Sequence, residues 1–197
     1  FIGRIEQTAK GILAEYHEKN PVSSGIQKGE FRKKLADKLY FKDVRAIDLL
    51  LRHLVQSEHL RDLGNHVALP SHKVEYKPEH LAVLARLEKR YLDAGFEIPE
   101  LEECIADEKD KELARQIIES MSESGRLKRL TYQYYMHSSH FDEAMKRFYD
   151  HMNKQGRITL AEYRDLLNTS RKYAVLILEY LDQQRITAMA DDARVLL

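Results

Sequence analysis

The chain has 197 residues, 43% of them hydrophobic and 32% charged, and its 32 basic residues balance its 32 acidic ones. This composition excludes an intrinsically disordered chain, and the length suits one large domain or two to three small ones. Because the net charge is zero, any contact with nucleic acid has to come from a local basic patch and not from a global field. Cys104 is the only cysteine, which excludes an intrachain disulfide and favours a reducing compartment, the cytoplasm.

Several classes of protein are disfavoured by missing patterns. No apolar run approaches the roughly 18 residues of a membrane span, and the first residues lack the pattern of a signal peptide. No GxxxxGKS, GxxxxGKT, GxGxxG or HExxH motif occurs, so nucleotide hydrolysis and zinc proteolysis are not predicted. Because the chain begins at Phe1 and not at a methionine, we expect it to be part of a longer protein.

The first third of the chain predicts a long helix, a short helix, a longer helix and a hairpin. Asn20-Pro21 ends the first helix, residues 30–39 form the short one, and Lys42 or Asp43 opens the next. The following segment alternates and turns at Gly64-Asn65, which predicts the hairpin. The apolar residues on the predicted helix faces are Ile5, Ile12, Leu13, Tyr16, Ile47, Leu50, Leu51 and Leu54.

The middle third repeats this order of elements. Pro78 suits the first turn of a helix that runs to Gly95, residues 100–105 predict the short helix, and the next helix stops at Gly125. Two strands are predicted in residues 126–137, although no glycine marks their turn. The apolar residues on the predicted helix faces are Leu81, Leu84, Leu87, Tyr91, Leu113, Ile117, Ile118 and Met121.

The last third shows the order once more, with a short strand after the first helix. That helix breaks at Gly156, two helices around a tight turn follow the strand, and residues 186–196 predict the hairpin. Asn168 or Thr169 is the predicted N-cap of the second of these two helices. The apolar residues on the predicted helix faces are Phe141, Met145, Phe148, Met152, Leu160, Tyr163, Leu166, Leu167, Ala174, Ile177, Leu178 and Leu181.

This repeated order is typical of winged helices. We therefore predict a mainly α-helical fold with small β-hairpins, built as three tandem winged-helix domains in an elongated array. Their predicted bounds are 1–72, 73–138 and 139–197, each near the lower size limit for a self-supporting core. A single helical bundle is the alternative, which the three alternating hairpins disfavour.

Two basic segments have both a structural and an RNA-binding interpretation. Residues 126–135 interleave basic and aromatic side chains, which suits phosphate contact and base stacking. Alternation on a hairpin explains the same pattern, because tyrosine is a good strand residue, and we favour this structural interpretation. A second cluster around the first short helix is most simply a solvated face, with RNA contact as the alternative; its members are Arg32, Lys33, Lys34, Lys38 and Lys42.

The histidines and the cysteine do not predict a metal or catalytic site. His137 and His140 have no second pair of ligand residues beside them, as a structural zinc site requires. The acidic neighbours Glu102 and Glu103 disfavour a thiolate at Cys104. We therefore predict a buried or inert thiol.

The most informative polar residues lie in the last third. Arg171 and Lys172 fall in the first turn of a predicted helix, where the positive end of the helix dipole is unfavourable for cations. A phosphate would be stabilised there by free helix N–H groups and by both side chains. We predict a phosphate-binding edge, with ordinary solvated residues as the alternative; its members are Arg157, Thr159, Arg164, Thr169, Ser170, Arg171, Lys172, Tyr173 and Arg194.

The run RDLLNTSRKYA and the segment around it resemble the final winged helix of the SelB family, the bacterial selenocysteine-specific elongation factors. The segments YHEKNP and GFEIPEL extend the resemblance collinearly, so that the three predicted domains correspond to the second, third and fourth of the family's C-terminal winged helices. The family's Thr-Ser-Arg-Lys motif falls on Thr169, Ser170, Arg171 and Lys172, and its Arg-Asp pair on Arg164 and Asp165.

The resemblance implies an mRNA-binding arm with no catalytic activity of its own. In the family, the last winged helix binds the selenocysteine insertion hairpin (SECIS) for incorporation at UGA codons. The distant GTPase body, which uses GTP and Mg, carries selenocysteinyl-tRNA to the ribosome. We therefore expect no cofactor in this chain, SECIS RNA and the ribosome as partners, no membrane, and a cytoplasmic monomer. Ala188 and Ala190 stand where family members often place arginine, which implies a smaller contribution from the hairpin.

Two functions of other classes remain alternatives. One is a tandem winged-helix DNA-binding regulator, whose helix over residues 169–184 would enter a major groove. Leu176 and Glu179 on its predicted exposed face disfavour this function. The other is a protein-interaction scaffold with winged helices as spacers, which fits the zero net charge and the acidic middle third.

Overall fold

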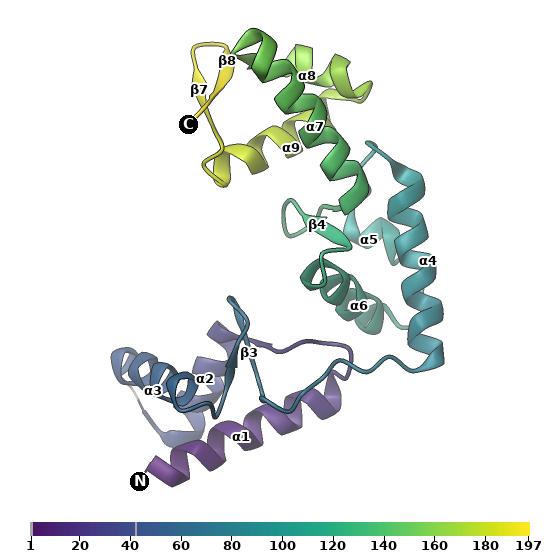
Figure 1. Ribbon diagram of the computed structural model, residues 1–197. Coiled ribbons are helices and arrows are strands. Elements are labelled where there is room, and N and C mark those ends of the chain that lie inside the picture. Colours follow the sequence, from purple (N-terminus) through teal and green to yellow (C-terminus); the bar gives the residue numbers. More distant parts are fainter. Residues whose placement is uncertain (1, 42) are drawn as a thin grey trace. The chain divides into compact units, whose positions relative to one another are not determined.

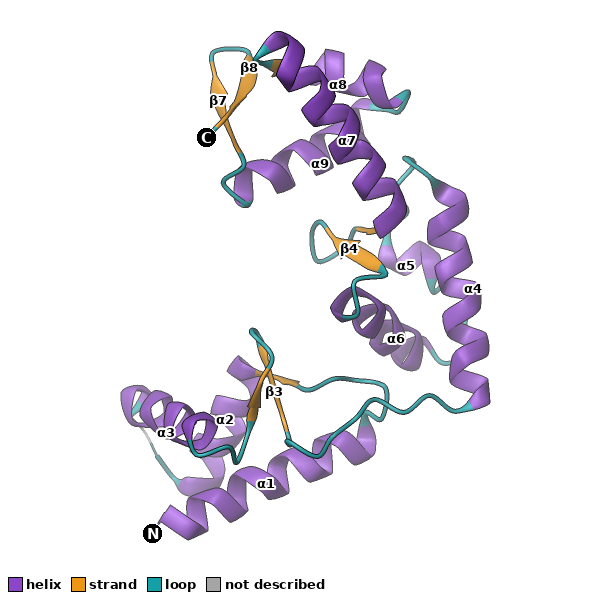
Figure 2. Ribbon diagram, viewed as in Figure 1, coloured by secondary structure: helices purple, strands orange, loops and turns teal. Residues whose placement is uncertain are grey.

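A computed structural model describes residues 2–41 and 43–197, with the side chain of Val44 left out. The chain divides into two compact units, Phe1–Pro78 and Glu79–Leu197. Helices dominate both units, and the strands are short (Figures 1 and 2). Lys42 lies outside the described residues, so its predicted place in the basic cluster stays a prediction.

The first unit has the predicted winged-helix order. A three-stranded antiparallel sheet in the order β1-β3-β2 packs with three helices. The turn at Gly64-Asn65 is confirmed: Gly64 has a φ of 79°, which glycine adopts without strain, and its N–H donates to Asp62 Oδ1. The elements are α1 (Ile2–Lys19), β1 (Ile26–Gln27), α2 (Lys28–Leu39), α3 (Val44–Gln56), β2 (Arg61–Asp62) and β3 (His66–Ala68).

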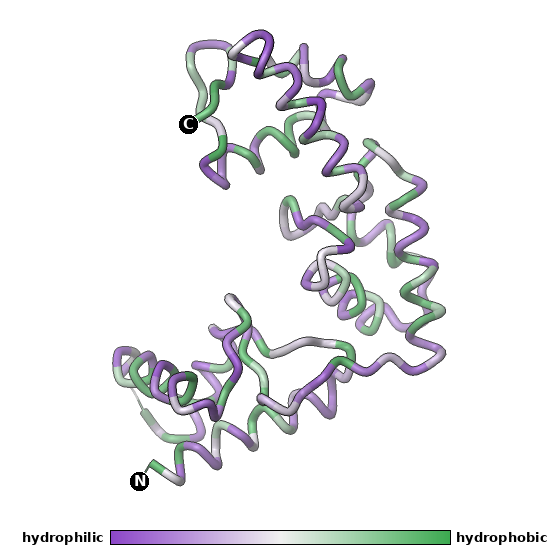
Figure 3. The backbone as a smooth tube through the Cα atoms, in the orientation of Figure 1, coloured by the Kyte–Doolittle hydropathy of each residue, from purple (hydrophilic) through white to green (hydrophobic). Residues whose placement is uncertain are grey.

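Local capping and amphipathic faces explain the helices of this unit. Asp43 is the N-cap of α3, and its side chain accepts the N–H of Arg45, which confirms one of the two predicted caps. Hydrophobic and hydrophilic stretches follow one another along the helices, as expected for helices with one apolar and one polar face (Figure 3). The buried cluster of the unit consists of Ile5, Ala9, Ile12, Leu13, Ile26, Phe31, Leu35, Leu51, Leu54, Leu60 and Val67.

A stacked histidine pair holds the end of α1 against the segment that follows the hairpin. The rings of His17 and His72 lie 3.5 Å apart at 11°. His17 Nε2 accepts the backbone N–H of Leu69 at 3.3 Å, and the His72 ring hydrogen-bonds the Ser23 carbonyl at 2.9 Å. Burial, followed by the nearby His72 and Arg61, lowers the pKa of His17 to about 4.

The free energy of unfolding is expected to fall as the pH decreases from about 6.5 towards 4. The unfolded chain binds a proton at His17 near its ordinary pKa of 6.5, whereas the folded chain binds it only near 4. The loss is on the order of 3 kcal/mol at the lower end of this range. Urea titrations at a series of pH values measure it, and His17→Gln, which keeps an acceptor for Leu69, should show a flatter profile. An identical profile for both proteins would contradict the assignment.

The second unit contains the other two repeats of the pattern. Its middle repeat has a two-stranded sheet, and the isolated bridge between Glu100 and Tyr134 takes the place of a third strand. Its last repeat has a three-stranded antiparallel sheet in the order β6-β8-β7. The elements are α4 (Pro78–Ala94), α5 (Leu101–Cys104), α6 (Lys111–Glu123), β4 (Leu127–Arg129), β5 (Tyr135–His137), α7 (Ser138–Gln155), β6 (Ile158–Thr159), α8 (Leu160–Leu167), α9 (Arg171–Gln183), β7 (Thr187–Ala190) and β8 (Ala193–Leu196).

The two repeats of the second unit share one hydrophobic cluster. Ile98, Leu130 and Met136 of the middle repeat belong to the same cluster as Phe148 and Leu178 of the last one. Helix α7 begins directly after β5, so no linker separates them. The three domains bounded at 72 and 138 stay a prediction, since the chain divides into compact units only near residue 78.

Two predicted exposures are wrong. Leu81, predicted on the buried face of α4, is 50% exposed. The buried residue is His80, which shares a helix face with Leu84 because the two are four residues apart. Leu176, expected on the exposed face of its helix, is partly buried against the shared cluster.

The structural interpretation of residues 126–135 is supported by burial. Leu127, Leu130, Tyr134 and Tyr135 are buried, and only Tyr132 among the tyrosines of this segment is 70% exposed. Arg126 and Arg129 form ion pairs with Glu88 and Glu119. In the other basic cluster, ion pairs join Arg32 to Asp48, Lys34 to Glu30 and Lys38 to Glu15.

The remaining features of the fold concern membranes, metals and the thiol. Within residues 2–41 and 43–197, none of the helices has the length and apolar character needed to cross a bilayer. The same residues contain no group of three His, Cys, Asp or Glu side chains arranged to hold a metal ion. Cys104 is buried, and burial raises its pKa, so the prediction of a buried thiol is confirmed.

Candidate nucleic-acid interface

The turn between α8 and α9 places the residues of the predicted edge. Thr159 caps α8: its hydroxyl accepts the N–H of Glu162 at 3.2 Å, and the Glu162 carboxylate accepts the N–H of Thr159 at 2.7 Å. Asn168 ends α8 in the left-handed conformation, with a φ of 51°. The next helix therefore starts only three residues later, at Arg171.

The N-cap of α9 is Ser170, so the prediction of Asn168 or Thr169 is wrong. Asn168 is already the C-cap of α8, and the Thr169 hydroxyl donates to the Phe96 carbonyl at 2.9 Å. The Ser170 hydroxyl makes no capping hydrogen bond in the described structure. The N–H groups in the first turn of α9 can therefore donate hydrogen bonds to an anion.

Three arginines of the edge are weakly held, and of these Arg157 and Arg171 are exposed whereas Arg164 is half-buried. Arg171 forms no ion pair with any other described residue. Arg164 pairs with its neighbour Asp165 at 2.6 Å, and Arg157 lies 3.8 Å from Asp192. Exposed pairs of this kind contribute at most about 1 kcal/mol, so a phosphate can replace the carboxylate.

Lys172 has partners in the middle repeat. Its Nζ lies 3.5 Å from Glu100 Oε1 and 5.1 Å from the centroid of the Tyr134 ring. The side chain of Tyr173 contributes a second ring at 5.5 Å. Hydrogen bonding to Tyr134, with a smaller contribution from the charge of Glu100, raises the pKa of Lys172 and so stabilises its ammonium form.

Arg194 is placed differently from the other cations of the edge. Its side chain is only 13% exposed, and Nε donates to Asp182 Oδ2 at 2.8 Å. The buried Thr187 donates to the other oxygen of the same carboxylate at 2.6 Å. Arg194 therefore ties β8 to the end of α9.

Several contacts of this region were not predicted from the sequence. They are the Thr169–Phe96 hydrogen bond, the approach of Glu100 and Tyr134 to Lys172, and the Asp182–Arg194 pair. The first two join residues far apart in the chain, and no local spacing signals them. The capping pair of Thr159 and Glu162 does have a local signal, the Thr-x-x-Glu spacing.

Comparisons with known proteins agree with this fold. Two family models, both described as the winged helix of elongation factor SelB, match residues 11–69 and 150–196. The selenocysteine-specific elongation factor of Desulfomicrobium baculatum is 26% identical over 186 residues, which cover 92% of this chain. The factor of Escherichia coli (strain K12) is 23% identical over 180 residues, or 91% of this chain. The chain spans 28% of the length of each relative.

Two solved structures share the fold at lower identity. The mRNA-binding domain of elongation factor SelB from E. coli, solved in complex with SECIS RNA, has a TM-score of 0.53 at 21% identity. That match covers 61% of this chain and 98% of the other. A bacterial selenocysteine-specific elongation factor EF-Sec has a TM-score of 0.53 at 14% identity over 100% of this chain and 30% of the other. Since the two family models together take in more than half of the sequence and the curated relatives match nearly all of it, the chain belongs to the SelB elongation-factor family and forms part of its winged-helix region.

Proposed function

We propose that this chain is the RNA-binding region of a selenocysteine-specific elongation factor, whose last winged helix binds the SECIS hairpin for selenocysteine incorporation at UGA codons. The observation that carries the proposal is the start of α9, where the exposed Arg171 lies beside a helix end that Ser170 does not cap. The names of the relatives support it, since the similar E. coli domain is an mRNA-binding domain solved with SECIS RNA.

The start of α9 suits a phosphate next to an unpaired nucleotide. Double-stranded A-form RNA hides its base edges in a deep, narrow groove, so sequence is recognised where nucleotides are unpaired. The helix N–H groups and the guanidinium of Arg171 bind one phosphate, because both are directed donors with positive charge. Arg164 and Arg157 exchange their weak carboxylate contacts for neighbouring phosphates.

The other members of the edge assist this contact. Lys172 adds positive charge from a position held by Glu100, and Ser170 and Tyr173 offer hydroxyl groups. Thr159, Thr169 and Arg194 act through the turn and the hairpin that their hydrogen bonds hold in place. We expect direct RNA contact by Arg194 to be small, because its guanidinium is mostly buried.

The remaining activities belong to the whole protein. We propose that a GTPase part outside this chain binds GTP and Mg and delivers selenocysteinyl-tRNA to the ribosome in the cytoplasm. The chain itself then catalyses no reaction, holds no cofactor and acts as a monomer. The winged-helix repeats contain the RNA site and connect it to that GTPase part.

Arg171→Ala is expected to weaken binding of a SECIS-type RNA hairpin. Losing one phosphate contact should reduce the slope of log affinity against log salt concentration by about one. Fluorescence anisotropy titrations of a labelled hairpin over a range of salt concentrations measure both quantities. Unchanged affinity and slope would contradict the proposed role of Arg171.

A matched control removes the same charge elsewhere. Lys154→Ala, at an exposed position near the end of α7, should leave hairpin affinity nearly unchanged. A DNA duplex that competes equally with the hairpin would favour a DNA-binding regulator. Absence of nucleic-acid binding even at low salt would favour a protein-interaction scaffold.

A further inference from the structure

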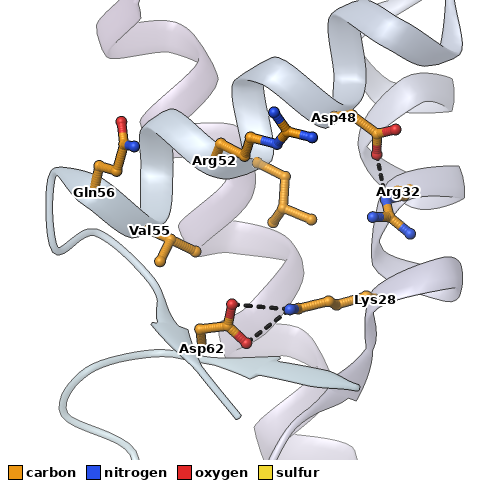
Figure 4. Close-up of a pocket in the computed structure, with 8 residues that line it drawn as sticks. Lys28, Arg32, Asp48, Arg52, Val55, Gln56 and Asp62 are labelled. Atoms are coloured by element: carbon orange, nitrogen blue, oxygen red, sulfur yellow. Dashed lines mark hydrogen bonds and ion pairs between the residues drawn. The ribbon is translucent and has the colours of Figure 1, made fainter. Parts of the chain in front are cut away.

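A pocket in the first unit collects charged side chains from three elements (Figure 4). Lys28 and Arg32 come from α2, Arg52 comes from α3, and Asp62 comes from β2. The pocket has a volume of about 360 Å³. It is large enough for a phosphate group and its hydration.

Ion pairs neutralise only part of the charge at this pocket. Lys28 Nζ lies 2.7 Å from Asp62 Oδ1, and Arg32 Nε lies 2.7 Å from Asp48 Oδ1. Arg52 forms no ion pair with another described residue. Three cations against two carboxylates leave one positive charge without an internal partner.

The outward face of α3 adds a second cation without a carboxylate partner. Arg45, Leu49, Arg52 and Gln56 fall within about 60° of one another around the helix and are all exposed. None of them is acidic, and Arg45 also forms no ion pair with another described residue. The corresponding helix of the middle repeat differs, because its Arg115 is paired with Glu102.

We propose that the α3 basic surface, defined as Lys28, Arg32, Arg45 and Arg52, is a second RNA-binding site, which contacts the phosphate backbone of duplex RNA without reading its sequence. Arg45 and Arg52 are two helical turns apart, about 10 Å along the axis, so their guanidinium groups reach different phosphates. The A-form major groove excludes a helix, which restricts α3 to contacts along the backbone.

Charge and composition favour RNA over a protein as the occupant. The outward face of α3 has one large apolar side chain, Leu49, at 64% exposure. The buried core of a protein–protein interface is mostly apolar and depleted in charged residues. The outward face of α3 lacks such an apolar core. Guanidinium groups match phosphate oxygens with two parallel hydrogen bonds each, and one such contact is possible for each unpaired arginine.

The test uses a blunt-ended RNA duplex of unrelated sequence with neither loop nor bulge. Anisotropy titrations over a range of salt concentrations should show that Arg45→Gln/Arg52→Gln weakens duplex binding. The slope of log affinity against log salt concentration should fall by about two, one for each lost phosphate contact. Thermal melting of the variant in parallel establishes that the first unit stays folded.

A matched double substitution distinguishes a site from general charge. Arg4→Gln/Lys10→Gln removes two exposed cations from α1 in the same unit and should leave the slope nearly unchanged. Equal losses from both double variants, or no duplex binding by the unsubstituted chain, would overturn the proposal.

The two RNA sites can also be separated. Arg171→Ala should retain the part of duplex binding that depends on Arg45 and Arg52, whatever its effect on the hairpin. Complete loss of duplex binding in Arg171→Ala would overturn the second site, because the duplex would then bind only in the second unit. A hairpin affinity unaffected by Arg171→Ala would contradict the proposed function. It would not contradict the proposed binding of duplex RNA by the α3 basic surface.

Discussion

Replacing Phe148 with Ala is expected to lower the free energy of unfolding of the second unit by about 3–5 kcal/mol. Phe148 is fully buried in α7, and its ring meets that of Tyr163 edge-on at 5.9 Å between centroids. It belongs to the cluster that both repeats of the unit share, so the cavity would affect packing on both sides. Urea denaturation followed by far-ultraviolet circular dichroism measures the change.

The control for this substitution is another aromatic residue of the same unit. Tyr132 is 70% exposed, and Tyr132→Ala should change the free energy of unfolding by no more than about 0.5 kcal/mol. A comparable loss in both variants would show that aromatic content, and not burial in the shared cluster, determines the stability.

Replacing Gly25 with Ala is expected to destabilise the first unit by about 2 kcal/mol. An added Cβ would lie 2.5 Å from the carbonyl oxygen of Val67 and 3.0 Å from its carbonyl carbon. Val67 pairs with Ile26 in the centre of the sheet, so relief of the clash requires movement of β3 relative to β1. Thermal and urea unfolding of the variant measure the effect.

Gly29→Ala is the matched control, with an expected effect of the opposite sign. An added Cβ at Gly29 meets no atom within 4 Å, and the residue lies in α2. Alanine is the better helix former, so the variant should gain up to about 1 kcal/mol. Destabilisation by both substitutions would contradict the steric explanation for Gly25.

Most secondary structure of this chain could be predicted because its signals are local. Pro78 begins α4, Asp43 caps α3 and Gly64 forms the hairpin turn through interactions within a few residues. The three-residue spacing from Leu81 to Leu84 misleads at the start of α4, where His80, four residues before Leu84, is buried in place of Leu81. Either residue is compatible with the chain pattern, and packing of the unit selects between them.

The membership of the candidate site stays a prediction, and its contacts were not predicted. Arg171 is exposed at the start of α9, a position that follows from the helical pattern. Arg194, in β8, is buried against Asp182, which lies in the last turn of α9. Ser170 stands at the N-cap position of α9 without a capping hydrogen bond, and the Thr169 hydroxyl before it donates to the carbonyl of Phe96, a residue of the middle repeat.

The amino-acid sequence by itself determined the repeated order of helices and hairpins and the family, because periodicity, caps and motifs act over short distances. Only the tertiary structure decided that the last two repeats share one hydrophobic cluster and that Lys172 lies beside Glu100 and Tyr134. It also decided which cations are neutralised within the chain and which remain exposed. Such contacts join residues far apart in the chain, and they form only when burial of apolar surface brings those segments together.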